Sequence, residues 1–265
     1  MASLTFLKLG GSLITDKTRP YQPHLDRLAA LAAQIAGYMQ EQPSARLLLG
    51  HGSGSFGHTA ASEYGTRLGV QGARGWRGFA EVHHQAALLN GFVMEALSEA
   101  GLAALSFPPV ASVLAQQGKV SVWDTGLLCS TLESGLLPVI YGDTVFDEAL
   151  GGTILSTEDL FAHLAPTLQP GRILLAGLES GVWADFPART RLLEVIPSTG
   201  YASLRSALGA AEGVDVTGGM LAKADQMMEL VQSVPGLKVT IFSALEEGSL
   251  QRALLGEPIG TRLEL

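Results

Sequence analysis

The sequence has little cysteine and no long hydrophobic run. One cysteine, Cys129, occurs among 265 residues, which excludes an intrachain disulfide framework and a cysteine-rich zinc site. The formal net charge is −8, so the overall field of the protein disfavours nonspecific binding to nucleic acid or to an acidic membrane surface. No stretch of about 20 apolar residues is present, so no membrane-spanning helix is expected. The start, MASLTFLKLGG, lacks a basic segment followed by a long apolar one, which predicts a cytoplasmic protein without a signal peptide.

Short apolar runs alternate with longer segments of helical spacing. Hydrophobic residues make up 47% and charged residues 16% of the chain, a balance typical of a globular protein. The apolar runs predict strands buried on both faces at 4–10, 45–51, 136–143, 171–178 and 237–244. The longer segments predict helices at 24–40 and 78–101. This alternation predicts an α/β fold, an open αβα sandwich with a mostly parallel central sheet, in one domain spanning 1–265. Residues 186–213 are the least regular and predict an insertion or a flap.

Three glycine clusters follow or precede these elements at the positions where ligands bind in open α/β sheets. Gly10-Gly11-Ser12 follows the first strand, and residues 51–58, HGSGSFGH, are expected to form a flexible loop after the second. Gly218-Gly219 opens a helical segment. Glycine lets backbone N–H groups approach a ligand, and a helix N-terminus favours an anion. Three such clusters favour a ligand with several phosphates, although glycine also makes ordinary turns. The Walker loop GxxxxGK[ST] is absent, and no GxGxxG is followed by a suitably spaced acidic residue.

Two of the five lysines stand beside glycine pairs. Lys8 lies within an apolar strand, where its ammonium is costly to bury unless it emerges at the strand end to meet an anion. Lys223 lies one turn into a helix, where a cation opposes the helix dipole unless an anion is near. Lys17 follows in the loop TDKTRP. Each could be a solvated lysine, but the positions of Lys8 and Lys223 favour phosphate binding.

Four motifs in order resemble the isopentenyl phosphate kinases of the amino acid kinase superfamily. They are KLGGSLITDK (8–17), HGSGSFGH (51–58), GDTVFD (142–147) and DVTGGMLAK (215–223), and the resemblance extends to about Leu245. The second histidine of HGSGSFGH is the narrower mark, because in these kinases such a histidine holds the acceptor phosphate. The resemblance implies an amino acid kinase fold and the transfer of the ATP γ-phosphoryl group to isopentenyl phosphate, giving isopentenyl diphosphate and ADP. No covalent intermediate or general base is needed, because the acceptor oxygen is already anionic, so catalysis rests on alignment and charge neutralisation.

The resemblance also implies roles for individual residues. The catalytic set is Lys8, Lys17, His58 and Lys223. ATP would be bound by Lys8, Leu9, Gly10, Gly11, Ser12, Gly54, Gly218, Gly219 and Lys223. The acceptor would be bound by Ser53, Gly54, His58 and Thr157. Residues from 1 to about 165 would form the acceptor-binding part and those from about 166 to 265 the nucleotide-binding part. Mg²⁺ would arrive with ATP, and the family suggests a homodimer. His51 is expected to be structural.

The prenyl group of such an acceptor needs an apolar pocket. Segment 79–97 corresponds to the helix that lines the acceptor in the family. Its helical spacing places Phe79, Val82, His83 and Ala86 on one face, and these residues are the expected wall. The alternative is that most of them belong to the core.

Asp143 and Asp159 would orient lysines or metal-bound water, or they would cap loops.

The sequence departs from the family pattern at three places. Ser53 stands where the family usually has glycine. In ILSTEDL (154–160) Thr157 replaces the glycine of an SGDD-like run, which places a hydroxyl near the acceptor phosphate. In GLESGVW (177–183) Leu178 and Ser180 replace both aspartates of a DxDGVY-like motif, which affects adenine and ribose recognition.

These departures leave three alternatives. A kinase of the same fold acting on another small phosphate or phosphonate, such as fosfomycin, also fits His58. A carboxylate or carbamate kinase is disfavoured by that histidine. A non-catalytic nucleotide-binding homologue is favoured by the lost aspartates and disfavoured by the retained Lys8, Lys17, His58 and Lys223.

Overall fold

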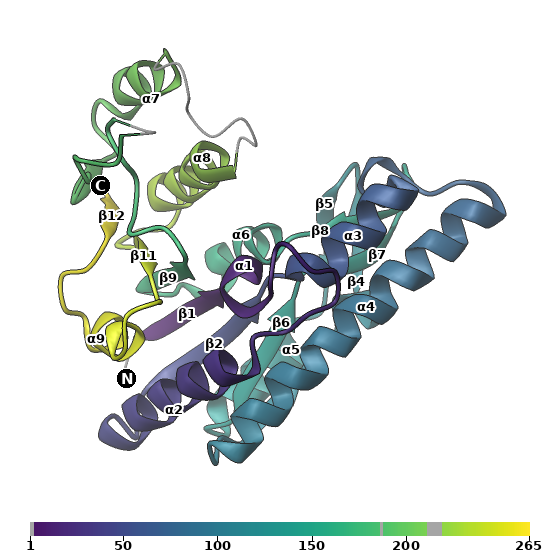
Figure 1. The fold of residues 1–265 in the computed structure, drawn as a ribbon, viewed down its shortest axis with the longest axis horizontal. Helices are drawn as coiled ribbons and strands as arrows, with labels where there is room; N and C mark the ends of the chain where they lie inside the picture. The colour runs from purple at the N-terminus through teal and green to yellow at the C-terminus, as the bar shows by residue number, and fades with distance from the viewer. Residues whose placement is uncertain (1–2, 186–187, 211–218) are drawn as a thin grey trace.

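A central sheet of eight strands forms the middle layer of the protein (Figure 1). The computed structural model describes residues 3–185, 188–210 and 219–265. In spatial order the strands are β10 (Val195–Pro197), β12 (Thr261–Glu264), β11 (Lys238–Ser243), β9 (Arg172–Gly177), β1 (Leu4–Leu9), β2 (Arg46–His51), β6 (Leu137–Tyr141) and β3 (Ala104–Ser106). From β11 to β3 every neighbouring pair in this order is parallel, whereas β12 pairs antiparallel with β11. The five predicted strands are confirmed, as is the mostly parallel sheet.

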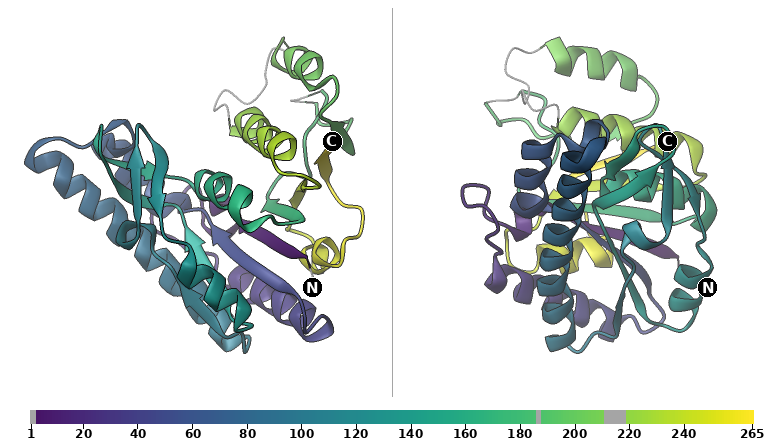
Figure 2. Two further views of the ribbon diagram at one scale, coloured as in Figure 1. Left: turned by 180° about the vertical axis from the view of Figure 1, so that it is seen from behind. Right: turned by 90° about the vertical axis from the view of Figure 1, so that its right-hand side faces the viewer.

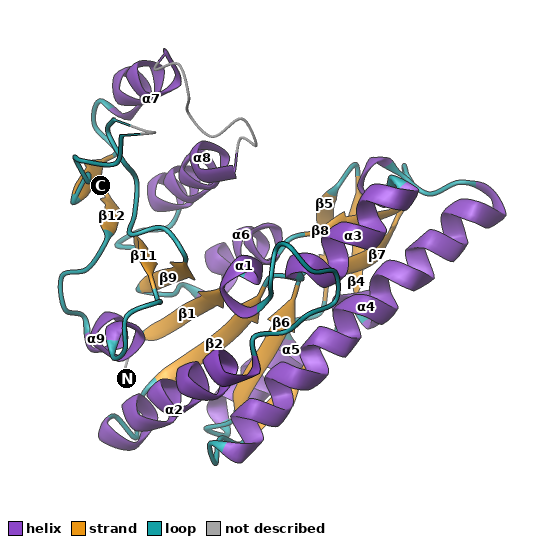
Figure 3. Ribbon diagram, in the orientation of Figure 1, coloured by secondary structure: helices purple, strands orange, loops and turns teal. Residues whose placement is uncertain are grey.

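Helices cover both faces of this sheet, so the predicted αβα sandwich is also confirmed (Figure 3). One apolar core lies beneath α1 (Gly11–Ile14), α2 (Leu25–Glu41), α4 (Gly72–Glu99) and α9 (Ser249–Leu255). The other lies beneath α5 (Gly126–Glu133), α6 (Thr157–Leu168) and α8 (Gly219–Ser233). Among the described helices, none is both long and apolar enough to cross a membrane.

The alternation of side chains along β1 decides where Lys8 points. Successive residues of a strand face opposite sides of the sheet. Leu4 and Phe6 pack into the core on the α6 side, and Leu7 and Leu9 pack into the core on the α2 side. Lys8 shares the parity of Leu4 and Phe6, so its side chain extends toward α6.

A second, four-stranded sheet was not predicted. Its order is β5 (Lys119–Trp123), β4 (Val113–Gln116), β7 (Asp143–Asp147) and β8 (Gly151–Leu155). The motif GDTVFD supplies β7, which pairs antiparallel with β8. Short strands joined by tight turns carry a weaker sequence signal than long buried ones. The sheet packs against α4, where the rings of Trp76, Phe79 and Phe146 form a cluster.

The segment after β2 differs from its prediction. Residues 54–64 form helix α3, so HGSGSFGH is a two-residue connection followed by helix and not a flexible loop. α3 lies beside the N-terminal half of α4, as both orientations in Figure 2 show. Helix α4 begins at Gly72, earlier than the predicted start at 78. Gly78 is required within it, because a Cβ at this position would lie only 2.3 Å from the Cγ and 2.4 Å from the Cβ of Tyr64.

The described part of the irregular region 186–213 contains regular structure. β10 joins the edge of the main sheet, and helix α7 (Tyr201–Ala210) follows it. Two 3₁₀ turns complete the described elements, η1 (Thr66–Leu68) and η2 (Pro109–Ala111).

Candidate active site

The first two glycine clusters contact each other at the carboxyl ends of β1 and β2. A Cβ on Gly11 would lie 2.6 Å from the Cα of Gly54, and a Cβ on Gly52 would lie 2.9 Å from the amide nitrogen of Gly11. Gly54 has a φ of +50°, which side chains rarely adopt. Glycine is therefore needed at these positions for the close approach of two backbones. The sequence alone suggested phosphate binding or ordinary turns for these glycines, and the contact between the two connections was not predicted.

Thr15 joins the same two connections. Its hydroxyl donates to the carbonyl of Gly11 at 2.8 Å and accepts from the backbone N–H of Ser55 at 3.0 Å. The start of α3 is thereby fixed against α1. Sequence reasoning missed Thr15, because a threonine four residues after a glycine has no distinctive pattern.

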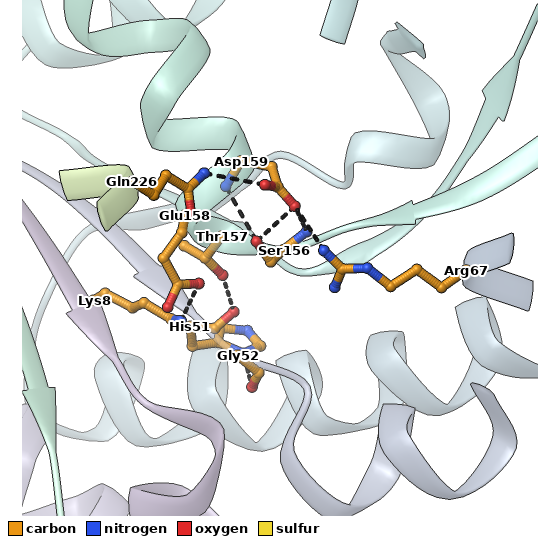
Figure 4. A network of polar contacts seen from close by, with 9 residues as sticks. All are labelled: Lys8, His51, Gly52, Arg67, Ser156, Thr157, Glu158, Asp159 and Gln226. Atoms are coloured by element: carbon orange, nitrogen blue, oxygen red, sulfur yellow. Dashed lines mark hydrogen bonds and ion pairs between the residues drawn. The ribbon is translucent and has the colours of Figure 1, made fainter. Parts of the chain in front are cut away.

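Lys8 forms an ion pair with Glu158 of α6 (Figure 4). Both residues are almost fully buried, with 8% and 4% of their surface exposed. Burial lowers the pKa of Lys8, and the carboxylate of Glu158 opposes that effect. Burial disfavours the ionised form of Glu158, but the charges of Lys8 and Lys223 outweigh it and hold the pKa of this carboxyl below its usual value. The sequence analysis expected the Lys8 ammonium to meet an anion at the strand end, and it did not predict that a buried protein carboxylate would be one such partner.

His58 lies in the second turn of α3, in the electrostatic field of several cations. The residue is exposed, yet the protein around the ring still lowers its pKa through partial burial. The positive charges of Arg67, Lys17, Lys8 and Lys223 lower it further. These charges come from four separate segments of the chain, so the structure brings the four predicted catalytic residues into one electrostatic environment. Lys17 and Lys223 are exposed, as side chains that meet a soluble ligand must be.

The start of α6 lies against the end of β2 and Gly142. Ser156 and Asp159 make a reciprocal capping box: the Ser156 hydroxyl accepts from the Asp159 N–H at 3.1 Å, and Asp159 accepts from the Ser156 N–H at 2.8 Å. Thr157 is buried, and its hydroxyl donates to the carbonyl of His51 at 2.6 Å. A Cβ on Gly142 would lie 3.7 Å from the Thr157 nitrogen, so the backbone at Gly142 runs close to this N–H. In the described part of the chain that N–H has no hydrogen-bond acceptor.

His51 is structural, as predicted. It is fully buried, its Nε2 lies 3.1 Å from the Oδ1 of Asn90, and its ring stacks on Tyr141. Burial lowers its pKa. The residue fixes the end of β2 against α4 and β6.

Asp143 and Asp159 are engaged elsewhere than with lysines. Asp143 is fully buried and accepts from the Nδ1 of His83 at 3.0 Å and from the N–H of Thr144 at 2.8 Å. Asp159 caps α6, as the alternative prediction had it, and also accepts from Gln226 at 3.1 Å. The carboxylate that contacts Lys8 is Glu158, which sequence reasoning missed. The run STED matches the pattern of a capping box, but nothing in it indicates which acidic residue would face β1.

The predicted acceptor wall lies on α4 where it packs against β7. Phe79, Val82 and Ala86 are buried there and belong to neither of the two main cores. His83 lies on the same part of the helix and is partly exposed. Its pKa is raised by the hydrogen bond with Asp143, whose own pKa is raised by burial. Helical spacing thus predicted that these four residues lie on the same part of α4. The ion pair of His83 with Asp143 was not predicted.

The third glycine cluster is described only in part. Gly218 lies outside the described residues, and Gly219 is the first residue of α8. Within GLESGVW, Glu179 accepts from the indole N–H of Trp183 at 3.2 Å and pairs with Arg189 at 3.0 Å. Glu179 lies between Leu178 and Ser180, so the carboxylate of this motif occupies the position between the two replaced aspartates. No group of three or more His, Cys, Asp or Glu side chains that could hold a metal occurs among the described residues.

A sequence profile described as "Amino acid kinase family" matches residues 3–243. The chain belongs to the amino acid kinase family. Among curated relatives, the isopentenyl phosphate kinase of Methanothermobacter thermautotrophicus is 36% identical over 272 residues, covering 98% of each chain. That of Haloferax volcanii is 37% identical over 231 residues, covering 86% of this chain and 88% of the relative.

A solved structure supports the same relationship. The structure titled "X-ray structures of isopentenyl phosphate kinase" superposes with a TM-score of 0.82 at 33% identity, covering 98% of this chain and 99% of that one. The family and its fold, both implied by the four motifs, are confirmed.

Proposed function

We propose that the protein transfers the γ-phosphoryl group of ATP to isopentenyl phosphate, giving isopentenyl diphosphate and ADP. The observation that carries this proposal is the 36% identity, over 98% of both chains, to a protein named isopentenyl phosphate kinase. The arrangement of the site supports it, because a histidine and several cations from separate segments converge beside two glycine connections. Such a site suits an acceptor and a donor that are both phosphates.

The reaction brings together two anions that repel each other, so binding them in line is the main task of the protein. Lys17 and Lys223 are exposed side chains that would neutralise charge on the transferred phosphoryl group and on the nucleotide. Lys8 would act with Glu158 as a buried pair, offering its ammonium to a phosphate oxygen without leaving the carboxylate. The backbones of Gly10, Gly11 and Ser12 would cradle the transferring phosphate, with Leu9 before them and Gly218-Gly219 on the nucleotide side.

The acceptor phosphate would lie between His58 and the start of α6. A dianion beside His58 favours the imidazolium form, which donates to phosphate oxygens. The backbone near Ser53 and Gly54 would contribute donors. Thr157 would contribute through its backbone N–H, because its hydroxyl already donates to the carbonyl of His51. The apolar chain of the acceptor would extend along Phe79, Val82, His83 and Ala86.

ATP would enter as its Mg²⁺ complex, in which phosphate oxygens and water supply most of the metal ligands. Residues up to about 165 would bind the acceptor, and those beyond would bind the nucleotide. The protein would be a homodimer in the cytoplasm, as its sequence suggests.

The experiment is ADP release by the purified protein with Mg-ATP and a panel of acceptors. The panel contains isopentenyl phosphate, dimethylallyl phosphate, fosfomycin, N-acetylglutamate and UMP. Turnover of isopentenyl phosphate with a KM in the micromolar range typical of physiological substrates supports the proposal. Turnover of only another acceptor retains the kinase and rejects the prenyl substrate. Stabilisation by ATP without any turnover favours a nucleotide-binding protein without kinase activity.

A further inference from the structure

Arg67 is a cation at the site that the sequence analysis did not consider. It lies in η1, the turn that links α3 to α4. Its backbone is anchored, because its carbonyl accepts from the Thr153 hydroxyl at 3.1 Å and the preceding Thr66 is buried. Its side chain is 65% exposed. Figure 4 shows the guanidinium pointing toward Ser156 and Asp159 at the start of α6. An anchored backbone and an exposed guanidinium that points toward the site are suited to binding a ligand.

The protein partner of Arg67 holds it only weakly. The guanidinium lies 3.6 Å from the Oδ2 of Asp159, beyond hydrogen-bond distance. That oxygen already accepts from the N–H and the hydroxyl of Ser156, at 2.8 and 2.7 Å, and the Oδ1 accepts from Gln226. Asp159 therefore does not depend on Arg67, and an exposed ion pair of this length contributes little to stability.

The proposed acceptor site has few positive charges that are free to bind a phosphate, so another cation there would strengthen binding. Lys8 is already paired with Glu158. His58 is the predicted phosphate ligand there, but burial and neighbouring cations disfavour its charged form when no anion is present. Among those cations Arg67 has the largest influence, so it lies within electrostatic reach of the imidazole. A guanidinium is always charged and binds phosphate through two parallel N–H groups.

We propose that Arg67 binds the phosphate of the acceptor together with His58. The acceptor phosphate would lie between the guanidinium and the imidazole, beside the start of α6, toward which the guanidinium points. The inference rests on the proposed function, since it assigns a further residue to the same acceptor.

The first test compares steady-state kinetics of the wild-type protein with those of Arg67→Ala, Arg67→Lys and Arg74→Ala. Arg74 is the matched control, because it is an exposed arginine near the start of α4 that makes no contact with α6 among those described. Arg67→Ala should raise the KM for isopentenyl phosphate about tenfold or more, with the KM for ATP changed less than about twofold. Arg67→Lys should recover part of the loss. Equal increases in both KM values, or none, would overturn the assignment.

The second test does not require turnover of isopentenyl phosphate. Histidine NMR signals are recorded during titration with inorganic phosphate, with the His58 signal assigned from a His58→Gln variant. In Arg67→Ala the pKa of His58 should rise in the absence of phosphate, because a neighbouring positive charge has been removed. The phosphate concentration that half-saturates the His58 shift should rise about tenfold. Arg74→Ala should resemble the wild type. An Arg67→Ala titration identical to that of the wild type would reject the inference even if the wild type phosphorylates isopentenyl phosphate.

Discussion

Lys8 of β1 and Glu158 of α6 form an ion pair although both residues are almost fully buried. Each charge is costly to remove from water, so each depends on the other. Lys223 acts on both members, lowering the pKa of Lys8 and of Glu158. The pair therefore links β1 to α6, and it lies in the electrostatic field of Lys223 from α8. A bound phosphate would join the same network of charges.

Glu158→Gln should lower the free energy of unfolding by about 3 kcal/mol or more, because it leaves Lys8 buried without a countercharge. Replacing both residues, as Lys8→Met with Glu158→Leu, should cost less than Glu158→Gln alone. Urea denaturation measures both effects. Glu133→Gln, at an exposed position of α5, is the control. A double variant less stable than Glu158→Gln would show that the pair itself is strongly stabilising.

His58 should take up a proton when the acceptor binds. Partial burial and nearby cations lower its pKa in the free protein, and a dianionic phosphate raises it in the complex. Between the two values, binding is coupled to proton uptake. Calorimetric titration near pH 7.5, in buffers of different ionisation enthalpy, measures the protons taken up by the wild type and by His58→Gln. The acceptor is then mostly dianionic, since the second pKa of a phosphate monoester is about 6. Equal proton uptake by both proteins would reject this role for His58.

His58→Ala should raise the KM for the acceptor much more than the KM for ATP, whereas Lys223→Ala should impair the use of ATP. The two variants test opposite sides of the site with one assay. The expected loss at His58 is that of a hydrogen bond to a charged group, about tenfold or more in KM. If His58→Ala raised both KM values equally, its assignment to the acceptor would fail.

Five parallel strands of the main sheet were predictable because their apolar runs are buried on both faces and are bounded by glycine, proline or polar residues. The second sheet was not, because its strands are short and its two hairpins are joined by the pairing of β4 with β7, about 30 residues further along the chain. The start of α4 was missed because QGARGW contains two glycines, which have low helix propensity. Tertiary packing overrides that propensity, as the contact of Gly78 with Tyr64 illustrates.

Some residues of the candidate site were predictable from the sequence, and others were not. The glycine connections, the lysines and His58 carry local motifs that a sequence reveals. Glu158 and Arg67 form ion pairs with residues 150 and 92 positions away, Lys8 and Asp159, and no local pattern encodes such a pair. The alternation of β1 determines which side of the sheet Lys8 faces, but only the topology shows that α6 covers that side.

Thr157→Val should lower the free energy of unfolding by about 1 kcal/mol, because the variant cannot donate to the carbonyl of His51. That carbonyl would still accept from the N–H of Gly142 at 3.1 Å, which limits the loss. The KM for the acceptor should change less than about twofold, since the backbone N–H is retained. Thr157→Ser, which keeps the hydroxyl, is the control. A large increase in acceptor KM in the valine variant alone would show that the hydroxyl contacts the acceptor.

The hydrogen bond between His83 and Asp143 should make stability depend on pH. It raises the pKa of His83 above its value in the unfolded chain, so its contribution is complete below about pH 6.5 and is lost as pH rises through the folded-state pKa. The stability advantage of the wild type over His83→Gln, measured as a difference in Tm, should therefore shrink between about pH 6 and about pH 9.

His84→Gln is the matched control for this measurement, because His84 is the exposed neighbour on the same helix. Asp143 opposes part of the effect, because burial raises its pKa and disfavours its ionised form. Asp143→Asn should accordingly lower the pKa of His83 in an NMR titration, since the partner that favours the imidazolium is removed. An advantage over His83→Gln that stays constant across this pH range would mean that the hydrogen bond is made equally well by neutral imidazole. In that case the folded and unfolded chains would bind the His83 proton equally well, and Asp143 would not favour the imidazolium form.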